Sequence, residues 1–267
     1  LRDIAEPLSE YSFANLYLFR DHHSYEVVLG DHVVVRGRTF GGRSYVMPTE
    51  HIDRMGTACI EEQLEEADFL FPIPETWLAR FPDDRFDISF HSGDADYLYT
   101  VEKMRSLSGR KLHKKRNLLK QFTESYSHDA LPLTNDRLGD ARFVLDAWKD
   151  ESGVDPVATD YGPCREALQL YDELVLCGGI YYADGEPAGF VLGEELNDET
   201  FVLHFAKART GFKGVYQYRF NNFAKILPPK YKYLNLEQDL DKENLRVFKS
   251  SYVPEAMVRK ARVALRT

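Results

Sequence analysis

Residues 178–239 combine two hydrophobic periods in an order that few folds accommodate. Apolar side chains first alternate, as in strands, then recur at helical spacing, and finally alternate again. The dipeptide Asp184-Gly185 favours a tight turn between the first two strands, and Pro228-Pro229 end the helix. The predicted segments are strands at 180–182, 189–196 and 200–207, a helix at 215–226 and a strand at 231–236.

A basic loop at 209–214 separates the third of these strands from the helix. The first N–H groups of a helix lack partners, and the helix dipole places partial positive charge there, so this position favours an anion. Arg209 and Lys213 add positive charge, and Gly214 would allow a ligand to approach the backbone closely. The alternative is an ordinary connection with solvated basic residues, because one such loop is a weak motif.

A similar order of elements occurs earlier, over residues 25–73, where two strands flank Gly30-Asp31 and a third strand, a helix and a strand follow. We therefore expect an α/β (α+β) fold of two tandem domains, 1–125 and 126–267, each with a mainly antiparallel sheet flanked by helices. The first copy lacks a glycine-containing basic loop, so the ligand site is expected in the second. Further helices are expected at 134–151, from Pro163, at 243–251 and at 254–263.

The segment that joins the two halves is strongly basic. Residues 103–120 contain eight Lys or Arg and no acidic residue, in a chain with 43 acidic and 34 basic residues. Like charges at helical spacing repel one another unless an anion neutralises them, and phosphate is the obvious anion. The predicted phosphate contacts are Lys111, Lys114, Lys115 and Arg116. The alternative is a solvated helix face.

The composition is that of a soluble globular protein, with 43% hydrophobic and 29% charged residues. No stretch approaches the roughly 20 apolar residues of a membrane span, and no signal-peptide pattern is present, so we expect a cytoplasmic location and no membrane segment. A net charge of -9 argues against a protein that coats DNA. The three cysteines are far apart, and the sequence predicts neither a disulfide framework nor a metal cluster.

Five phrases, in this order, resemble the phosphatidylglycerol lysyltransferase C-terminal-domain family. They are LSGRKLHKKRN at 107–117, HFAKA at 204–208, GVYQ at 214–217, NLEQDL at 235–240 and KSSYVP at 249–254. The resemblance spans nearly the whole chain. It implies two tandem domains of the Gcn5-related acetyltransferase fold, and kinship with Fem-type transferases, which take an aminoacyl group from charged tRNA.

The same resemblance bears on coenzyme A. Acetyltransferases bind its pyrophosphate through the pattern Arg/Gln-x-x-Gly-x-Gly/Ala, and the matching positions here are Arg209, Phe212 and Gly214. Phe212 replaces the first glycine, and its bulk hinders close approach of a ligand to the backbone. This puts coenzyme A in doubt and leaves another phosphate-bearing donor, such as aminoacyl-tRNA, open.

Acyl transfer to an amine requires removal of a proton, stabilisation of a tetrahedral oxyanion, and two substrates held together. Polar side chains suited to these tasks occur within residues 178–239 and just after them. The candidate catalytic residues are Glu194, His204, Glu237, Asp239 and Tyr252. The further candidate donor-binding residues are Lys207, Tyr216, Gln217, Asn235 and Lys249.

Five of these residues also have a purely structural interpretation. His204 would be a hydrogen-bonded, half-buried histidine, and Glu237 and Asp239 a solvated pair in a loop. Lys207 and Lys249 would form salt bridges. Three functions remain open: an acyl- or aminoacyltransferase with an amine or hydroxyl acceptor, a non-catalytic module of the same fold that binds tRNA or another phosphorylated ligand, and a structural or regulatory partner.

Overall fold

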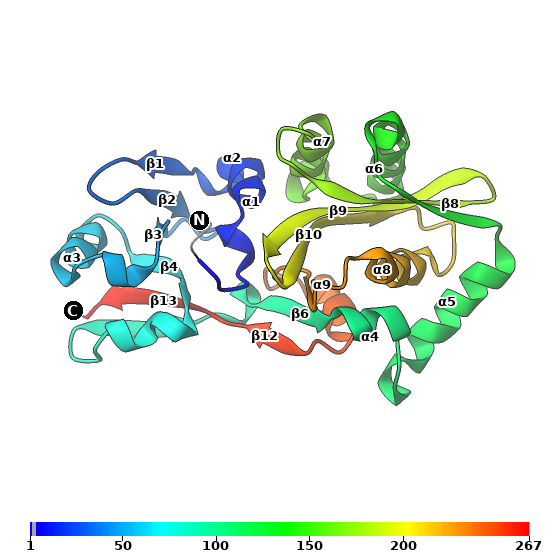
Figure 1. Cartoon of the computed structure of the whole chain (residues 1–267). Helices are drawn as coiled ribbons and strands as arrows, with labels where there is room; N and C mark the ends of the chain where they lie inside the picture. Colours follow the sequence, from blue (N-terminus) through cyan, green and yellow to red (C-terminus); the bar gives the residue numbers. More distant parts are fainter. Residues whose placement is uncertain (2–3, 267) are drawn as a thin grey trace. The chain divides into compact units, whose positions relative to one another are not determined.

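A computed structural model describes Leu1 and residues 4–266 of the chain. These residues form two compact units, each built on a mixed sheet with helices packed against it (Figure 1). The first unit comprises Leu1–Asp96, Gln238–Leu245 and Met257–Thr267, and the second comprises Tyr97–Glu237 and Arg246–Ala256. Residues 97–125 therefore lie with the second unit, whereas the sequence placed the boundary after residue 125.

The sheet of the first unit has the strand order β1-β2-β3-β4-β13-β5. β3 and β4 pair in parallel, and the other neighbours pair antiparallel. The strands are β1 (Glu26–Val28), β2 (Val34–Arg38), β3 (Ser44–Pro48), β4 (Phe69–Pro74), β5 (Phe86–Phe90) and β13 (Lys260–Leu265). The helices are α1 (Phe13–Leu18), α2 (Arg20–His23) and α3 (Thr57–Glu65).

The sheet of the second unit has the order β12-β6-β11-β10-β9-β8-β7. β10 and β11 pair in parallel, whereas β6–β11, β9–β10, β8–β9 and β7–β8 pair antiparallel. The strands are β6 (Asp96–Thr100), β7 (His128–Pro132), β8 (Cys177–Ala183), β9 (Glu186–Asn197), β10 (Thr200–Ala208), β11 (Tyr233–Asn235) and β12 (Ala256–Val258). The helices are α4 (Val101–Ser106), α5 (His113–Ser125), α6 (Leu138–Ser152), α7 (Tyr161–Gln169), α8 (Val215–Ile226) and α9 (Glu243–Ser250).

Helices cover both faces of this second sheet: α6 and α7 lie on one face and α8 on the other (Figure 1). The apolar stripe of α8 explains its position, because Val215, Phe220 and Phe223 are all buried in the core. α5 packs against α8, and the rings of Phe122 and Tyr218 stack with their centroids 4.6 Å apart. This packing fixes the loop that precedes α8.

The expected order of elements is confirmed twice, as β1-β2-β3-α3-β4 and as β8-β9-β10-α8-β11. The expected helix at 254–263 is wrong, because this segment forms β12 and β13. β13 lies between β4 and β5, where Ala261 and Val263 are fully buried. Pairing with strands on both sides outweighs the helical spacing of so short a segment. In residues 1 and 4–266, no helix has the length and hydropathy that crossing a bilayer would require.

Candidate functional site

A buried histidine lies between two carboxylates in the second unit. His204 is in β10; Glu194 comes from the neighbouring β9, and Glu237 follows β11 on the other side. Nδ1 of His204 lies 2.7 Å from Oε1 of Glu237, and Nε2 lies 3.0 Å from Oε1 of Glu194. The imidazole is fully buried, whereas the side chains of Glu194 and Glu237 are 18% and 14% exposed.

These contacts determine the charge of His204. Burial by itself would lower its pKa, but the hydrogen bonds and charges of Glu194 and Glu237 outweigh this effect and raise the pKa to about 9. The side chain is therefore an imidazolium at neutral pH, with a carboxylate at each nitrogen. In this state it orients the two carboxylates and is not itself a free base. His204 lies at an irregularity of the β9–β10 pairing, where the register shifts between Leu203 and Phe205.

The segment after β11 holds Glu237 in a fixed orientation. Its φ of 58° lies in the left-handed region, which costs free energy for a residue with a side chain. The Glu237 N–H donates to Oδ1 of Asn235 at 2.6 Å, and Nζ of Lys249 donates to the carbonyls of Leu236 and Glu237 at 2.6 and 3.2 Å. Five of the predicted residues thus meet in the structure. We call Glu194, His204, Asn235, Glu237 and Lys249 the His204 cluster.

A second polar group surrounds Tyr252, which is completely buried. Its hydroxyl accepts a hydrogen bond from Nε2 of Gln217 at 3.2 Å, and Nζ of Lys115 lies 4.1 Å from its ring centroid. Burial lowers the pKa of Lys115 and raises that of Tyr252 to about 12. Tyr252 is therefore a neutral phenol that hydrogen-bonds, and it is not suited to act as a base.

Two buried residues were not predicted from the sequence: Arg219, which interacts with Tyr252, and Tyr181, which interacts with Arg219. Arg219 of α8 is 1% exposed, and among the described residues its Nε and Nη1 have no hydrogen-bond partner. The hydroxyl of Tyr181, in β8, is also buried without a partner there. The position of Arg219 was a usable signal, because it lies four residues from both Val215 and Phe223, on the apolar stripe of α8. We call Lys115, Tyr181, Gln217, Arg219 and Tyr252 the Tyr252 cluster.

The loop at 209–214 is held by acidic residues of the chain itself. Glu151 accepts hydrogen bonds from the backbone N–H and the hydroxyl of Thr210, at 2.5 and 2.8 Å. Arg209 pairs with Glu186 at 2.8 Å and lies over the ring of Phe212. The Lys213 N–H donates to the hydroxyl of Tyr126 at 3.3 Å. Carboxylates thus lie where the sequence led us to expect a phosphate.

Gly214 is required for a reason different from the expected one. Its φ is 92°, and a Cβ built on it would lie 2.2 Å from the carbonyl oxygen of Leu118 and 2.9 Å from Cβ of Phe122. The glycine therefore allows α5 to pack against the start of α8. Close approach of a ligand is not needed to explain it.

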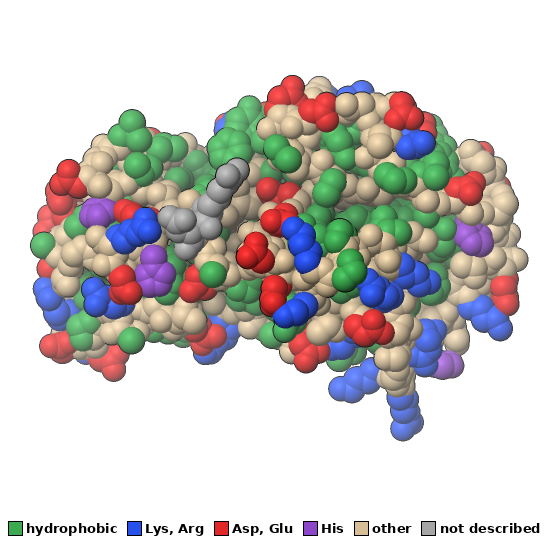
Figure 2. All heavy atoms as spheres, viewed as in Figure 1, with side chains coloured by type: hydrophobic (Ala, Val, Ile, Leu, Met, Phe, Trp, Pro, Cys, Tyr) green, Lys and Arg blue, Asp and Glu red, His purple; other side chains and the backbone are tan. Residues whose placement is uncertain are grey.

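The predicted basic segment divides into three environments. Lys111 and Lys114 are exposed and have no ion-pair partner among the described residues, whereas Lys115 turns inward to Tyr252. Arg116 donates to the carbonyls of Leu107 and Gly109, so it holds the preceding turn. Figure 2 shows Lys and Arg side chains, in blue, gathered around the projecting turn between α4 and α5 at the lower right of the view.

The remaining predicted residues belong to neither cluster. Lys207 points to the face covered by α6 and α7, where its Nζ lies 2.6 Å from Asp160 and 3.7 Å from the ring centroid of Trp148. The Tyr216 hydroxyl donates to the carbonyl of Ala208 at 3.2 Å. Asp239 belongs to the first unit, where its carboxylate accepts from the N–H of Asp241 at 2.9 Å.

These phrases and this geometry agree with one known family. Residues 1–263 match the family described as "Phosphatidylglycerol lysyltransferase, C-terminal". The chain belongs to this family. The resemblance seen in the five sequence phrases is thereby confirmed.

Solved structures similar to this family member share its two-unit fold. A conserved protein of unknown function from Bacteroides thetaiotaomicron has a TM-score of 0.83 and 26% identity, over 96% of this chain and 91% of that one. L-PGS from Bacillus licheniformis has a TM-score of 0.59 and 16% identity, over 98% and 93%. FemX has a TM-score of 0.59 and 8% identity, over 95% and 91%. The expected fold of two units, each with a mixed sheet flanked by helices, is confirmed.

A curated relative of this family member is an uncharacterized protein of Mycoplasmoides gallisepticum. The two are 26% identical over 186 residues, which is 66% of this chain and 58% of the relative. The matched region thus spans less than two thirds of the relative's length.

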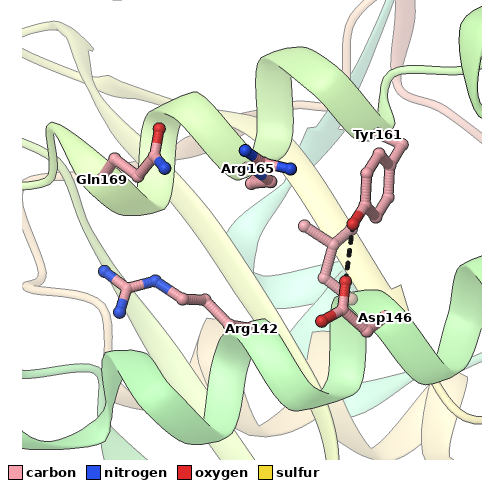
Figure 3. A pocket seen from close by; sticks show the side chains of 6 residues that line it. Arg142, Asp146, Tyr161, Arg165 and Gln169 are labelled. Atoms are coloured by element: carbon pink, nitrogen blue, oxygen red, sulfur yellow. Dashed lines mark hydrogen bonds between the residues drawn. The ribbon is translucent and has the colours of Figure 1, made fainter.

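One open pocket lies apart from both clusters, between α6 and α7 (Figure 3). It has a volume of about 270 Å³ and contains none of the predicted site residues. The Tyr161 hydroxyl donates to Asp146 at 2.6 Å across one end, and Arg142 donates to the carbonyl of Leu168. Tyr161, Asp146 and Arg142 thus already have hydrogen-bond partners within the protein.

Proposed function

We propose that this chain transfers an aminoacyl group from an aminoacyl-tRNA to an amine or hydroxyl acceptor. Membership in the lysyltransferase family supports transfer of an aminoacyl group. The choice between the two donors is supported by the contact of Glu151 with Thr210. A carboxylate at this loop repels the pyrophosphate of coenzyme A and occupies a backbone donor that it would use. This favours aminoacyl-tRNA over acyl-CoA.

The reaction breaks an ester. The acceptor nitrogen or oxygen forms a bond to the aminoacyl carbonyl carbon, the bond from that carbon to the ribose oxygen breaks, and the acceptor's proton ends on the ribose hydroxyl. We assign the transfer of this proton to Glu237, because its carboxylate is partly exposed and held by His204. Glu194, on the other side of the imidazolium, is assigned to the ammonium group of the amino acid.

The test uses total tRNA charged with radiolabelled amino acids, offered with small amines and with phosphatidylglycerol vesicles as acceptors. Label should move from tRNA to an acceptor, and Glu237→Gln should slow this at least about 100-fold, as expected for loss of a general base. Glu199→Gln, an exposed residue paired with Lys232, is the matched control and should keep the wild-type rate. With labelled acetyl-CoA as the donor, we expect the protein to transfer no label to any acceptor.

Two results would contradict this proposal. Transfer from acetyl-CoA but not from charged tRNA would reverse the assignment of the donor. Binding of tRNA without movement of label, across the whole acceptor set, would identify a non-catalytic module of the same fold.

The exposed lysines predict how tRNA binding depends on salt. Each phosphate contact contributes roughly 0.7 to 0.9 to the slope of log affinity against log salt concentration. The double variant Lys111→Ala, Lys114→Ala should therefore bind tRNA more weakly and with a slope flatter by about 1.5. The control is Lys120→Ala, because this lysine is already 3.5 Å from Glu124. An unchanged slope in the double variant would make these lysines a solvated surface only.

A further inference from the structure

The Tyr252 cluster concentrates positive charge without compensating acid. Arg219 and Lys115 both approach Tyr252, and no carboxylate among the described residues forms an ion pair with either of them. The rings of Tyr216 and Phe220 lie 4.5 and 4.8 Å from the Arg219 guanidinium carbon. Such ring contacts offset part of the cost of burying the charge, but among the described residues Nε and Nη1 of Arg219 still have no acceptor.

The hydroxyl and amide groups around this charge are suited to an oxyanion. The charge of Arg219 acts on both phenols: burial, the larger effect, raises the pKa of Tyr181 and Tyr252, and Arg219 opposes it. Both phenols are therefore neutral groups that can donate hydrogen bonds. Tyr181 has no partner among the described residues, and Gln217 contributes an amide beside Tyr252. Buried polar groups in native proteins are nearly always hydrogen-bonded, so these orphaned donors require an explanation.

We infer that the Tyr252 cluster binds a phosphate group, with Arg219 and Tyr181 as buried donors and Lys115 as the more exposed cation. Two positive charges with phenol donors match a phosphate better than a singly charged carboxylate, which a single arginine would neutralise. This inference extends the proposed transferase site. The phosphate belongs either to the 3′ end of the donor tRNA or to a small phosphorylated acceptor, and the chemistry of recognition is the same for both.

Inorganic phosphate is the probe for this site. Titration calorimetry should give saturable binding, and phosphate should raise the melting temperature of the wild-type protein. Arg219→Gln and Lys115→Gln should each raise the Kd for phosphate at least about tenfold, because each removes one of the two charges. Lys120→Gln is the matched control on the same helix, since its side chain is exposed and lies 3.5 Å from Glu124, and should leave the Kd unchanged.

Lys115→Gln also protects the test against misfolding, because this side chain is only half-buried and its replacement should leave the fold intact. Two further ligands distinguish the sources of the phosphate: the trinucleotide CCA for the donor end and glycerol 3-phosphate for a small acceptor. The ligand that competes with inorganic phosphate identifies the source, and either result supports the site.

The inference is overturned if phosphate shows no saturable binding, or if it binds Arg219→Gln and Lys115→Gln as tightly as wild type. Arg219 would then be a packing residue. These outcomes are separate from those of the transfer assay. Phosphate binding without aminoacyl transfer would leave this site standing and remove the proposed reaction, and transfer without phosphate binding would do the reverse.

Discussion

Gly214→Val should destabilise the protein by about 3 kcal/mol or more. Valine is strained at a φ of 92°, which costs roughly 1–3 kcal/mol, and its Cβ would lie 2.2 Å from the Leu118 carbonyl oxygen. Overpacking of a core contact costs roughly another 1–3 kcal/mol. The clash cannot be relieved cheaply. The Leu118 oxygen belongs to the backbone of α5, and the position of the Cβ is fixed by the backbone at the start of α8. Urea unfolding followed by circular dichroism measures the loss.

Gly211→Val is the matched control in the same loop. A Cβ at Gly211 meets no atom within 4 Å, so this variant should stay within about 1 kcal/mol of wild type. If Gly214→Val unfolded at the same urea concentration as Gly211→Val, the packing of α5 on the start of α8 would be wrong. If Gly214→Val loses ligand binding, its stability must be measured as well, because unfolding alone would also abolish binding.

Raising the pH through about 9 should remove about 3 kcal/mol of stability that His204 contributes. Its pKa is about 9 in the folded protein and 6.5 in the unfolded chain, and this difference corresponds to about 3 kcal/mol. Because the folded pKa is the higher one, the contribution is fully present below pH 6.5 and is lost as the pH rises past 9. Urea unfolding of wild type and His204→Gln over this range measures it as the difference between the two proteins, which cancels other titrating groups.

The imidazole signal in a proton NMR titration provides an independent measurement. Its midpoint should lie near pH 9, and Glu194→Gln should move it to lower pH by removing one of the two carboxylates. This second variant keeps the histidine, so it tests the charge even where His204→Gln folds poorly. A midpoint near 6.5 in wild type would show that the carboxylates do not hold a proton on the ring.

The order of elements was predictable because it depends on local periodicity and turn residues, as at Asp184-Gly185. β13 was not, because six residues between two strands take their conformation from their partners. The same distinction applies to the site. His204, Asn235 and Glu237 lie together because they are on or just after the neighbouring strands β10 and β11, whose positions the local periodicity indicated.

Residues whose partners are distant in sequence were harder to interpret. Lys207 pairs with Asp160, and Thr210 bonds to Glu151, and no local pattern indicates either contact. Arg219 differs from Lys207 and Thr210 in this respect. Its place among apolar residues of α8 was visible in the sequence, but only the structure reveals that its Nε and Nη1 have no acceptor among the described residues.

The position of β13 also has a consequence for biosynthesis. The first unit needs residues 260–265 to join β4 to β5, and the whole of the second unit is translated between β5 and β13. During vectorial synthesis the second unit can thus fold on the ribosome while the first waits, with two strand edges unpaired, for its last strand. A nascent chain arrested before residue 260 should expose these edges to chaperones, although most of the first unit has already been made.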